Sequence, residues 1–239
     1  MAALIIGLAA HIYKFTNTLY NHDALFNVYS VNDVLTSGRW FLAAASMPSS
    51  CFDLPWINGL LSLMWIALTA AVVVDVFCIR STPGTVLTGG LLAVFPSVTA
   101  TFFYEFTADA YMLAMLLASL SVYFNRVGDR VKWHIPMASL LICLCCGIYQ
   151  AYVSFALLLS MGHFILELLN DRQDDRLLYR WIGRQFIVYG AGLLAYYIIW
   201  KLRMYGAGTV ASSYQGIGEI GNMSVAGLFA CLLYTSDAA

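Results

Sequence analysis

The sequence predicts an all-α, polytopic transmembrane helix bundle of about seven spans, with the start of an eighth. Hydrophobic residues make up 61% of the 239 residues and charged residues 10%, and the mean hydropathy is +0.77. A soluble domain carries about 25% charged residues. Apolar runs long enough to cross a bilayer also recur along the chain. The net charge of −1 gives no support for nucleic-acid binding, because charges on opposite sides of a membrane are not pooled.

The apolar runs set the predicted spans. The run 135–166 contains no Asp, Glu, Lys or Arg and would form a helix of about 48 Å, which is too long for one upright crossing. We therefore expect two spans within it, meeting near residues 147–150. In chain order the predicted spans are 2–15, which is short, 54–79, 84–104, 108–124, the two within 135–166, 185–200, and an eighth that begins at 224.

The basic residues orient these spans. With a cytoplasmic N-terminus, eight of the twelve lie in inner loops, an excess that fits the positive-inside rule. The eight are Arg80, Arg126, Arg130, Lys132, Arg172, Arg176, Arg180 and Arg184. The long polar segments, 14–53 and 201–223, then lie outside. We expect the functional site on that side, because only there is enough polar chain to build one.

The first outer segment predicts an interfacial helix. Asn32 and Asp33 can cap a helix that runs through Leu35 and Trp40–Leu42, with Met47–Ser50 ending it. Its apolar and aromatic residues suit a helix that lies in the membrane interface.

Asp23 is the candidate catalytic residue of the same segment. As a carboxylate just outside the first span, it can act as a general base that removes the proton from a hydroxyl attacking an anomeric carbon. One carboxylate acting as base implies inversion at that carbon. The alternative is that Asp23 caps a turn, with Asn21 and His22 as ordinary interface residues.

Further polar residues fall at the outer ends of the predicted spans. Glu105 and Asp109 share one helical face if the helix has begun at Glu105, and they are candidates for binding sugar hydroxyls or a metal ion. The alternative is that they are charges of a helix N-terminus. Arg39 is a candidate phosphate ligand, with snorkelling to lipid headgroups as its alternative. Gln150, at an outer turn, could bind a sugar hydroxyl.

No cofactor is predicted. The cysteines show neither a zinc spacing nor a disulfide framework, and a divalent metal is possible but not indicated. Residues 232–239 resemble translated sequencing-adapter sequence. We therefore expect one transmembrane domain over residues 1–230, C-terminally truncated, and a non-native tail at 231–239.

Six motifs resemble the N-terminal part of the type II O-antigen glucosyltransferases, the serotype-converting family. They fall in order between about residues 2 and 205. The motifs are Tyr20-Asn21-His22-Asp23, Ser37-Gly38-Arg39-Trp40-Phe41, Leu54-Pro55-Trp56, Phe95-Pro96-Ser97-Val98-Thr99, Phe106-Thr107-Ala108-Asp109-Ala110-Tyr111 and Tyr149-Gln150-Ala151-Tyr152.

The resemblance implies a polytopic C-type glycosyltransferase of the bacterial inner membrane. Such an enzyme would move glucose from undecaprenyl phosphate to a lipopolysaccharide O-antigen on the periplasmic side, and Asp23 matches the catalytic acid of its first outer loop. His22, Arg39, Glu105, Asp109 and Gln150 are then candidate substrate-binding residues. The family's C-terminal helices and outer segments, where acceptor recognition is often placed, are missing here, so this fragment can lack activity.

Two other functions share these features. A transporter or flippase of lipid-linked glycans would also have many spans, but it would carry charged residues along a path within the helices, whereas the middles of the predicted spans are nearly free of charge. An O-antigen polymerase would use related substrates without an activated monosaccharide donor.

Overall fold

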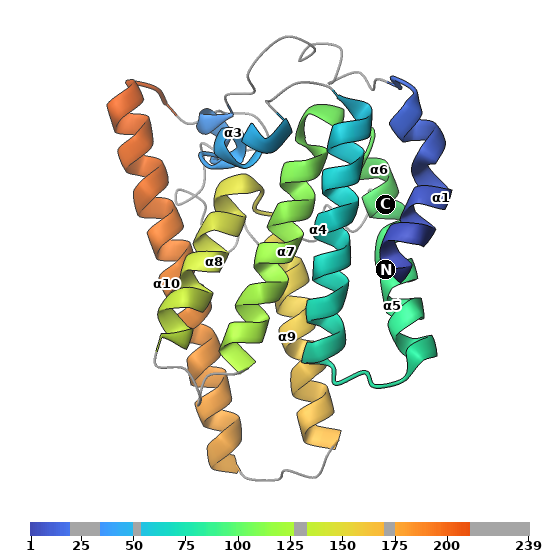
Figure 1. Cartoon of the computed structure of the whole chain (residues 1–239). Helices are drawn as coiled ribbons and strands as arrows, with labels where there is room; N and C mark the ends of the chain where they lie inside the picture. The colour runs from blue at the N-terminus through green and yellow to red at the C-terminus, as the bar shows by residue number, and fades with distance from the viewer. Residues whose placement is uncertain (20–33, 50–53, 127–132, 170–174, 211–239) are drawn as a thin grey trace, which may run out of the picture.

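The computed structural model describes residues 1–19, 34–49, 54–126, 133–169 and 175–210, and this part of the chain is all helical (Figure 1). The main helices run up and down the bundle. They are α1 (Ala2–Thr16), α4 (Pro55–Val76), α5 (Thr82–Val94), α6 (Pro96–Thr101), α7 (Glu105–Arg126), α8 (His134–Ile148), α9 (Tyr152–Leu169) and α10 (Asp175–Ala207).

Five helical segments in the described ranges are long and apolar enough to cross a membrane. They are Pro55–Val76, Thr82–Thr101, Glu105–Arg126, Tyr152–Leu169 and Trp181–Ala207. The predicted spans at 2–15 and within 135–148 are helices too, but α1 and α8 have only 15 residues each. All seven predicted spans therefore lie on helices, but only five of those helical segments are long enough to count as candidate membrane spans. The eighth, from residue 224, lies outside the described residues.

Prolines and a serine cap set several helix ends. Pro55 is in the first turn of α4, where a missing N–H costs nothing. The Ser81 side chain accepts a hydrogen bond from the Gly84 amide (3.2 Å) and caps α5. Pro96 then ends α5 and starts α6, so the predicted span 84–104 is broken near its end.

The lower end of α4 closes with a left-handed residue that is not glycine. The Ile79 amide donates to the Val74 carbonyl (2.9 Å) and the Cys78 amide to the Asp75 carbonyl (3.1 Å), which is the Schellman pattern. Cys78 has φ +53°, a conformation that costs a residue with a Cβ about 1–2 kcal/mol. Arg126 of α7 braces this turn by donating to the Asp75 carbonyl (2.6 Å) and the Cys78 sulfur (2.9 Å).

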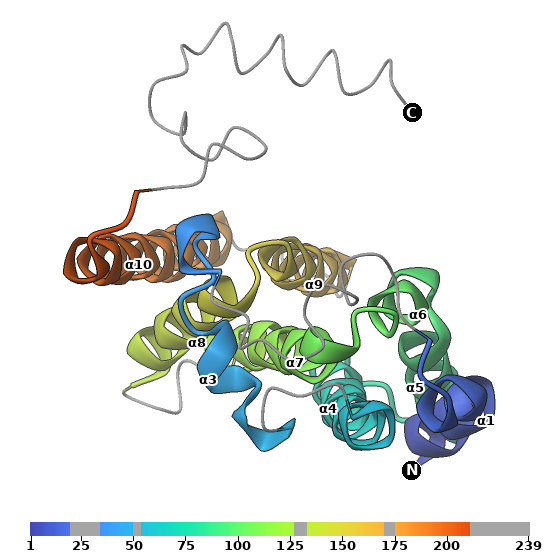
Figure 2. The same cartoon turned by 90° about the horizontal axis from the view of Figure 1, so that it is seen from above.

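Helix α7 is the centre of the bundle. It packs against α4, α8 and α9, and seen from above it lies between them, with α1 and α5 on one side and α10 on the other (Figure 2). Small buried residues on α7 allow the neighbouring helices to approach closely. These are Ala108, Ala110, Ala114, Ala118 and Ser119.

The predicted interfacial helix is wrong as a single helix. The chain instead forms three short turns, η1 (Leu35–Ser37), α3 (Leu42–Ala45) and η2 (Met47–Ser49). Gly38 follows η1 with φ +87°, and a left-handed residue ends a helix there. Leu42 is fully buried, so these turns pack into the bundle. The proposed cap residues Asn32 and Asp33 lie outside the described residues.

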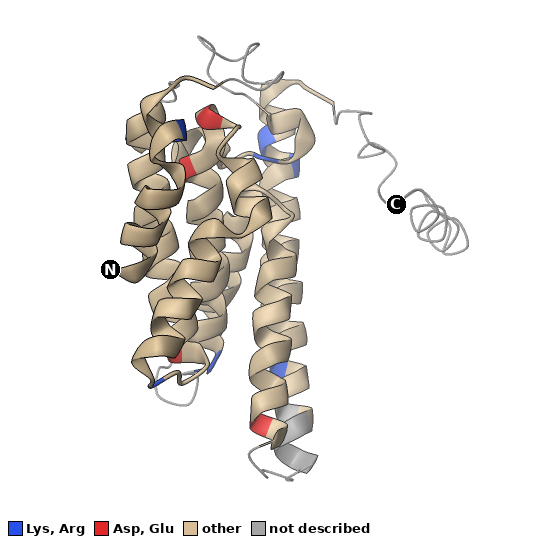
Figure 3. Cartoon of the chain, turned by 90° about the vertical axis from the view of Figure 1, so that its right-hand side faces the viewer, with Lys and Arg blue, Asp and Glu red and all other residues tan. Residues whose placement is uncertain are grey.

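Figure 3 shows that the charged residues of the described chain lie towards the two ends of the bundle. We call these ends upper and lower, as they are drawn in Figure 1. The upper end is where α1 ends and α7 begins. The lower end is where α4 ends and α5 begins. The four basic residues predicted to lie outside, at positions 14, 39, 201 and 203, share the upper end with Glu105 and Asp109. Lys14 pairs with Glu105 there. Trp200, next to Lys201, donates a hydrogen bond to Leu35, which lies close to Arg39 in sequence.

Candidate active site at the upper end

A buried ion pair joins α1 to α7. Lys14, in the last turn of α1, pairs with Glu105, in the first turn of α7, and both side chains are buried. The Lys14 ammonium also donates to the Leu19 carbonyl (2.8 Å), while the Leu19 amide approaches the Glu105 carboxylate (3.3 Å). Asn58 of α4 donates to the Glu105 carbonyl (2.6 Å). Glu105 is therefore neutralised and helps to fix the chain that leaves α1.

Asp109 lies one turn further along α7, and α7 does begin at Glu105, so the two acids share a face as expected. Asp109 is 1% exposed, and neither carboxylate oxygen has a hydrogen-bond partner among the described residues. The nearby Ser49 hydroxyl donates instead to the Ser46 carbonyl (2.9 Å). A buried carboxylate with no partner is costly, which makes Asp109 a stronger functional candidate than Glu105.

Arg39 is held by Tyr111 and Tyr149, which form a cluster with Tyr152. It donates to the Tyr111 hydroxyl (3.0 Å), and its guanidinium lies 4.6 Å from the centre of the Tyr149 ring, a cation–π distance. The Tyr111 and Tyr149 rings stack with 4.8 Å between centroids, and Tyr152 meets Tyr149 edge-on at 6.1 Å. Arg39 Nε has no acceptor within the described ranges. The guanidinium is thus oriented while one donor stays unused.

Gln150 holds the segment around Gly38 in place. Its Nε2 donates to the Ser37 carbonyl (3.0 Å) and to the Tyr196 hydroxyl (2.8 Å). A Cβ on Gly38 would clash with that hydroxyl and lie 2.5 Å from Gln150 Nε2. Both hydrogens of the Gln150 amide are therefore occupied by positioning contacts.

Three further contacts fasten residues 34–49 to the bundle. The Trp200 indole donates to the Leu35 carbonyl (2.8 Å), and the Phe41 amide donates to the Gly147 carbonyl (2.8 Å). The Trp40 ring covers Gly147 so closely that a Cβ there would lie 2.8 Å from it. The segment that carries Arg39 is thus attached to α10 and to the end of α8.

The structure brings four predicted site residues to the upper end, namely Arg39, Glu105, Asp109 and Gln150. His22 and Asp23 lie outside the described residues. Several residues that support this region were not predicted to do so, namely Lys14, Tyr111, Tyr196 and Trp200. The aromatic residues in a periodic apolar helix gave no separate signal. Lys14 did give a signal, as a basic residue in the last turn of a predicted helix.

Over the described ranges, no group of three or more His, Cys, Asp or Glu side chains could hold a metal ion.

Comparison with protein families gives a match to the model described as Glucosyl transferase GtrII, over residues 12–236. Comparisons with curated proteins and with solved structures give no match. The matched region contains every candidate residue of the upper end and includes all helices from α4 to α10. The chain is a multi-pass membrane protein that belongs to the GtrII glucosyltransferase family.

Proposed function

We propose that this chain transfers glucose from an undecaprenyl-phosphate donor to a lipopolysaccharide O-antigen on the periplasmic side of the bacterial inner membrane, with Asp23 as general base. Family membership carries the proposal. The positions of Arg39 and Asp109 also support it, because both lie at the end of the bundle where α1 ends. Asp23 belongs to the sequence between α1 and the segment that carries Arg39.

The proposed reaction is a single displacement. The acceptor hydroxyl oxygen forms a bond to the anomeric carbon as the bond from that carbon to the phosphate oxygen breaks. Asp23 takes the hydroxyl proton, and polyprenyl phosphate leaves with the electron pair. The phosphate is already a good leaving group, so base catalysis at the acceptor is the main need, and it is typically worth about 10²–10⁴-fold. One carboxylate base implies inversion.

Arg39 would bind the donor phosphate. Two tyrosines fix its guanidinium, and the Nε donor has no acceptor among the described residues. Guanidinium groups bind phosphate oxygens through paired N–H donors. A preorganised cation there would stabilise the charge that develops on the leaving phosphate.

Asp109 would accept hydrogen bonds from sugar hydroxyls, since its two oxygens lack partners in the described structure. His22 is proposed to bind the substrate beside Asp23. Glu105 and Gln150 support the site through the contacts above, Glu105 by its pair with Lys14 and Gln150 by its bond to Ser37.

Replacing the proposed base tests the assignment. Cells that express the protein with Asp23→Asn should lose surface glucosylation by about 10²-fold or more. Asp75→Asn is the matched control, because Asp75 is an exposed acid at the lower end and its loss should leave transfer unchanged. Undiminished transfer by Asp23→Asn would refute the base assignment.

A second experiment separates the enzyme from a transporter or polymerase. Membranes containing the protein are incubated with labelled polyprenyl-phosphate glucose and an O-antigen acceptor. Transfer of label supports the proposal, and binding without transfer supports the alternatives. In the described spans the acidic and basic residues lie towards the helix ends, as Figure 3 shows, which favours the enzyme, since a transport path through a membrane would need charged groups within the helices.

A further inference from the structure

A tyrosine of α10 reaches the segment that carries Arg39. The Tyr196 hydroxyl lies against Gly38, where a Cβ would clash with it, so the glycine beside Arg39 in the sequence leaves room for this hydroxyl. The Tyr196 side chain also interacts electrostatically with Arg39. Both Arg39 and Tyr196 are partly exposed. The polar ends of the two side chains therefore lie in the same part of the upper end, and neither is sealed in the core.

The hydrogen bonds of Gln150 determine how the Tyr196 hydroxyl is used. Gln150 Nε2 donates to the Ser37 carbonyl (3.0 Å), and a carbonyl can only accept, so this end of the amide is its NH₂ group. The second hydrogen of that group is donated to the Tyr196 hydroxyl oxygen (2.8 Å). The hydroxyl thus acts as an acceptor towards Gln150, and its own hydrogen has no acceptor among the described residues. Tyr196 therefore has one unused donor beside Arg39.

The ring of Tyr196 is held in place as well as its hydroxyl. It stacks on the Trp200 indole, with 6.3 Å between the ring centroids and 16° between the ring planes. The same indole is buried and donates to the Leu35 carbonyl (2.8 Å). A side chain that is already fixed loses little rotamer freedom when it binds a ligand. The hydroxyl is therefore a preorganised donor, as the guanidinium of Arg39 is.

We propose that the Tyr196 hydroxyl donates a hydrogen bond to a phosphate oxygen of the polyprenyl-phosphate donor, beside the guanidinium of Arg39. This inference rests on the proposed function and adds α10 to the elements that bind the donor phosphate. Phosphate oxygens accept hydrogen bonds, which matches the unused O–H of Tyr196 and the unused Nε donor of Arg39. The phosphate gains charge as it leaves, so both donors would bind it more strongly in the transition state than in the ground state.

Binding of the product lipid tests the inference without requiring transfer. The whole chain in a phosphate-free detergent is titrated with polyprenyl phosphate and with polyprenol of the same length, and isothermal titration calorimetry gives the dissociation constants. We expect the wild-type protein to prefer the phosphate. Tyr196→Phe should weaken phosphate binding about tenfold, the effect of one hydrogen bond to a charged group, and leave polyprenol binding unchanged. Tyr189→Phe is the matched control, because it removes another hydrogen-bonded hydroxyl of α10, which meets Ser160 at 3.0 Å, and it should bind as wild type.

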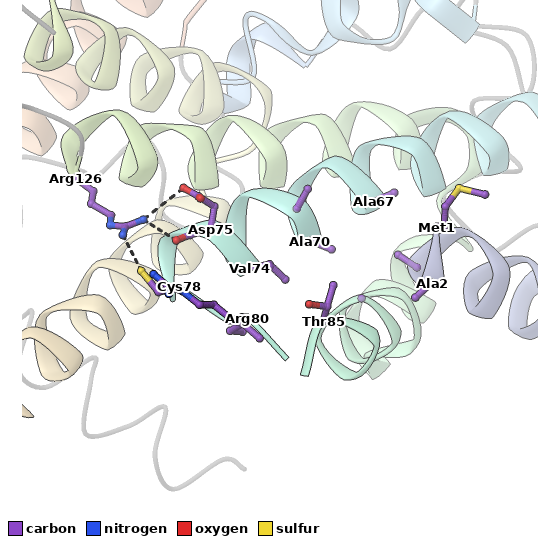
Figure 4. A pocket seen from close by; sticks show the side chains of 14 residues that line it. Met1, Ala2, Ala67, Ala70, Val74, Asp75, Cys78, Arg80, Thr85 and Arg126 are labelled. Atoms are coloured by element: carbon purple, nitrogen blue, oxygen red, sulfur yellow. Dashed lines mark hydrogen bonds and ion pairs between the residues drawn. The ribbon is translucent and has the colours of Figure 1, made fainter. Parts of the chain in front are cut away.

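A double variant distinguishes direct donation by Tyr196 from positioning of Arg39 through Gln150. If Tyr196 acted only by holding the segment that carries Arg39, its replacement would have no further effect in the background of Arg39→Gln. We expect instead that Arg39→Gln with Tyr196→Phe binds polyprenyl phosphate at least about fivefold more weakly than Arg39→Gln alone. Arg80→Gln, at an exposed position of the lower end (Figure 4), controls for the change in charge and should bind as wild type.

The possible results also distinguish a failure of this inference from a failure of the proposed function. Equal affinities of the wild-type protein and Tyr196→Phe, or of Arg39→Gln with and without Tyr196→Phe, would overturn the role of Tyr196 and leave the proposed transfer intact. Equal binding of polyprenyl phosphate and polyprenol by the wild-type protein would instead overturn the donor-phosphate site itself, and this inference with it.

Discussion

Gly38→Ala should release the segment that carries Arg39. Gly38 has φ +87°, so any side chain there costs about 1–2 kcal/mol of conformational strain. The new methyl group would also displace Gln150 and Tyr196. Two hydrogen bonds of Gln150, to the Ser37 carbonyl and the Tyr196 hydroxyl, would be lost at about 1 kcal/mol each. The expected total is about 3–4 kcal/mol.

Amide hydrogen exchange measures this change locally. A cost of about 3 kcal/mol should raise the opening of residues 34–49 roughly a hundredfold, and glucosyl transfer should fall with it. Gly208→Ala is a matched control, since Gly208 also has a positive φ (+64°) but a Cβ there would meet no other atom. It should cost only the strain and leave exchange in residues 34–49 unchanged. Equal exchange of that segment in both variants would refute the reasoning.

Three other predictions follow from the contacts at the two ends. Lys14→Met alone leaves a buried unpaired carboxylate and should destabilise the protein by about 3–5 kcal/mol, while adding Glu105→Gln should restore most of that loss; thermal unfolding of the single and double variants measures it, and a double variant no better than the single would contradict the pair. Cys78→Gly should stabilise the protein by about 1 kcal/mol by removing the left-handed strain, whereas Cys78→Ala, which removes only the sulfur, should not; equal unfolding temperatures for both would disprove the strain. Asp109→Asn should preserve or raise stability, since it removes a costly buried charge, and should reduce transfer by at least about tenfold; full transfer with lowered stability would show that Asp109 is structural.

The arrangement of the spans was largely predictable because it depends on local composition. The division of residues 135–166 into two helices followed from bilayer thickness alone, and the structure confirms it with a break at 149–151. The start of a helix at Glu105, with Asp109 on the same face, was also accessible from spacing. The continuous interfacial helix failed because Gly38 adopts a left-handed conformation, which composition alone does not reveal.

The candidate site was less predictable because its contacts join distant parts of the chain. Lys14 and Glu105 are 91 positions apart, and Trp200 and Leu35 are 165 apart. A single sequence gives no information on which polar residue meets which across such separations. Glu105 and Gln150 were therefore predictable as polar residues at the upper end, but their hydrogen bonds to other groups of the protein were not.

The length of helix α10 determines how this helix fits the membrane. Its membrane-crossing segment, Trp181–Ala207, has 27 residues and amounts to about 40 Å, against a hydrocarbon core of about 30 Å. A helix with that mismatch accommodates by tilting or by changing the local bilayer thickness, and α10 is inclined across the bundle in Figure 1. The same helix holds Leu35 through Trp200 and Gln150 through Tyr196. We therefore expect a change in bilayer thickness to shift the segment that carries Arg39.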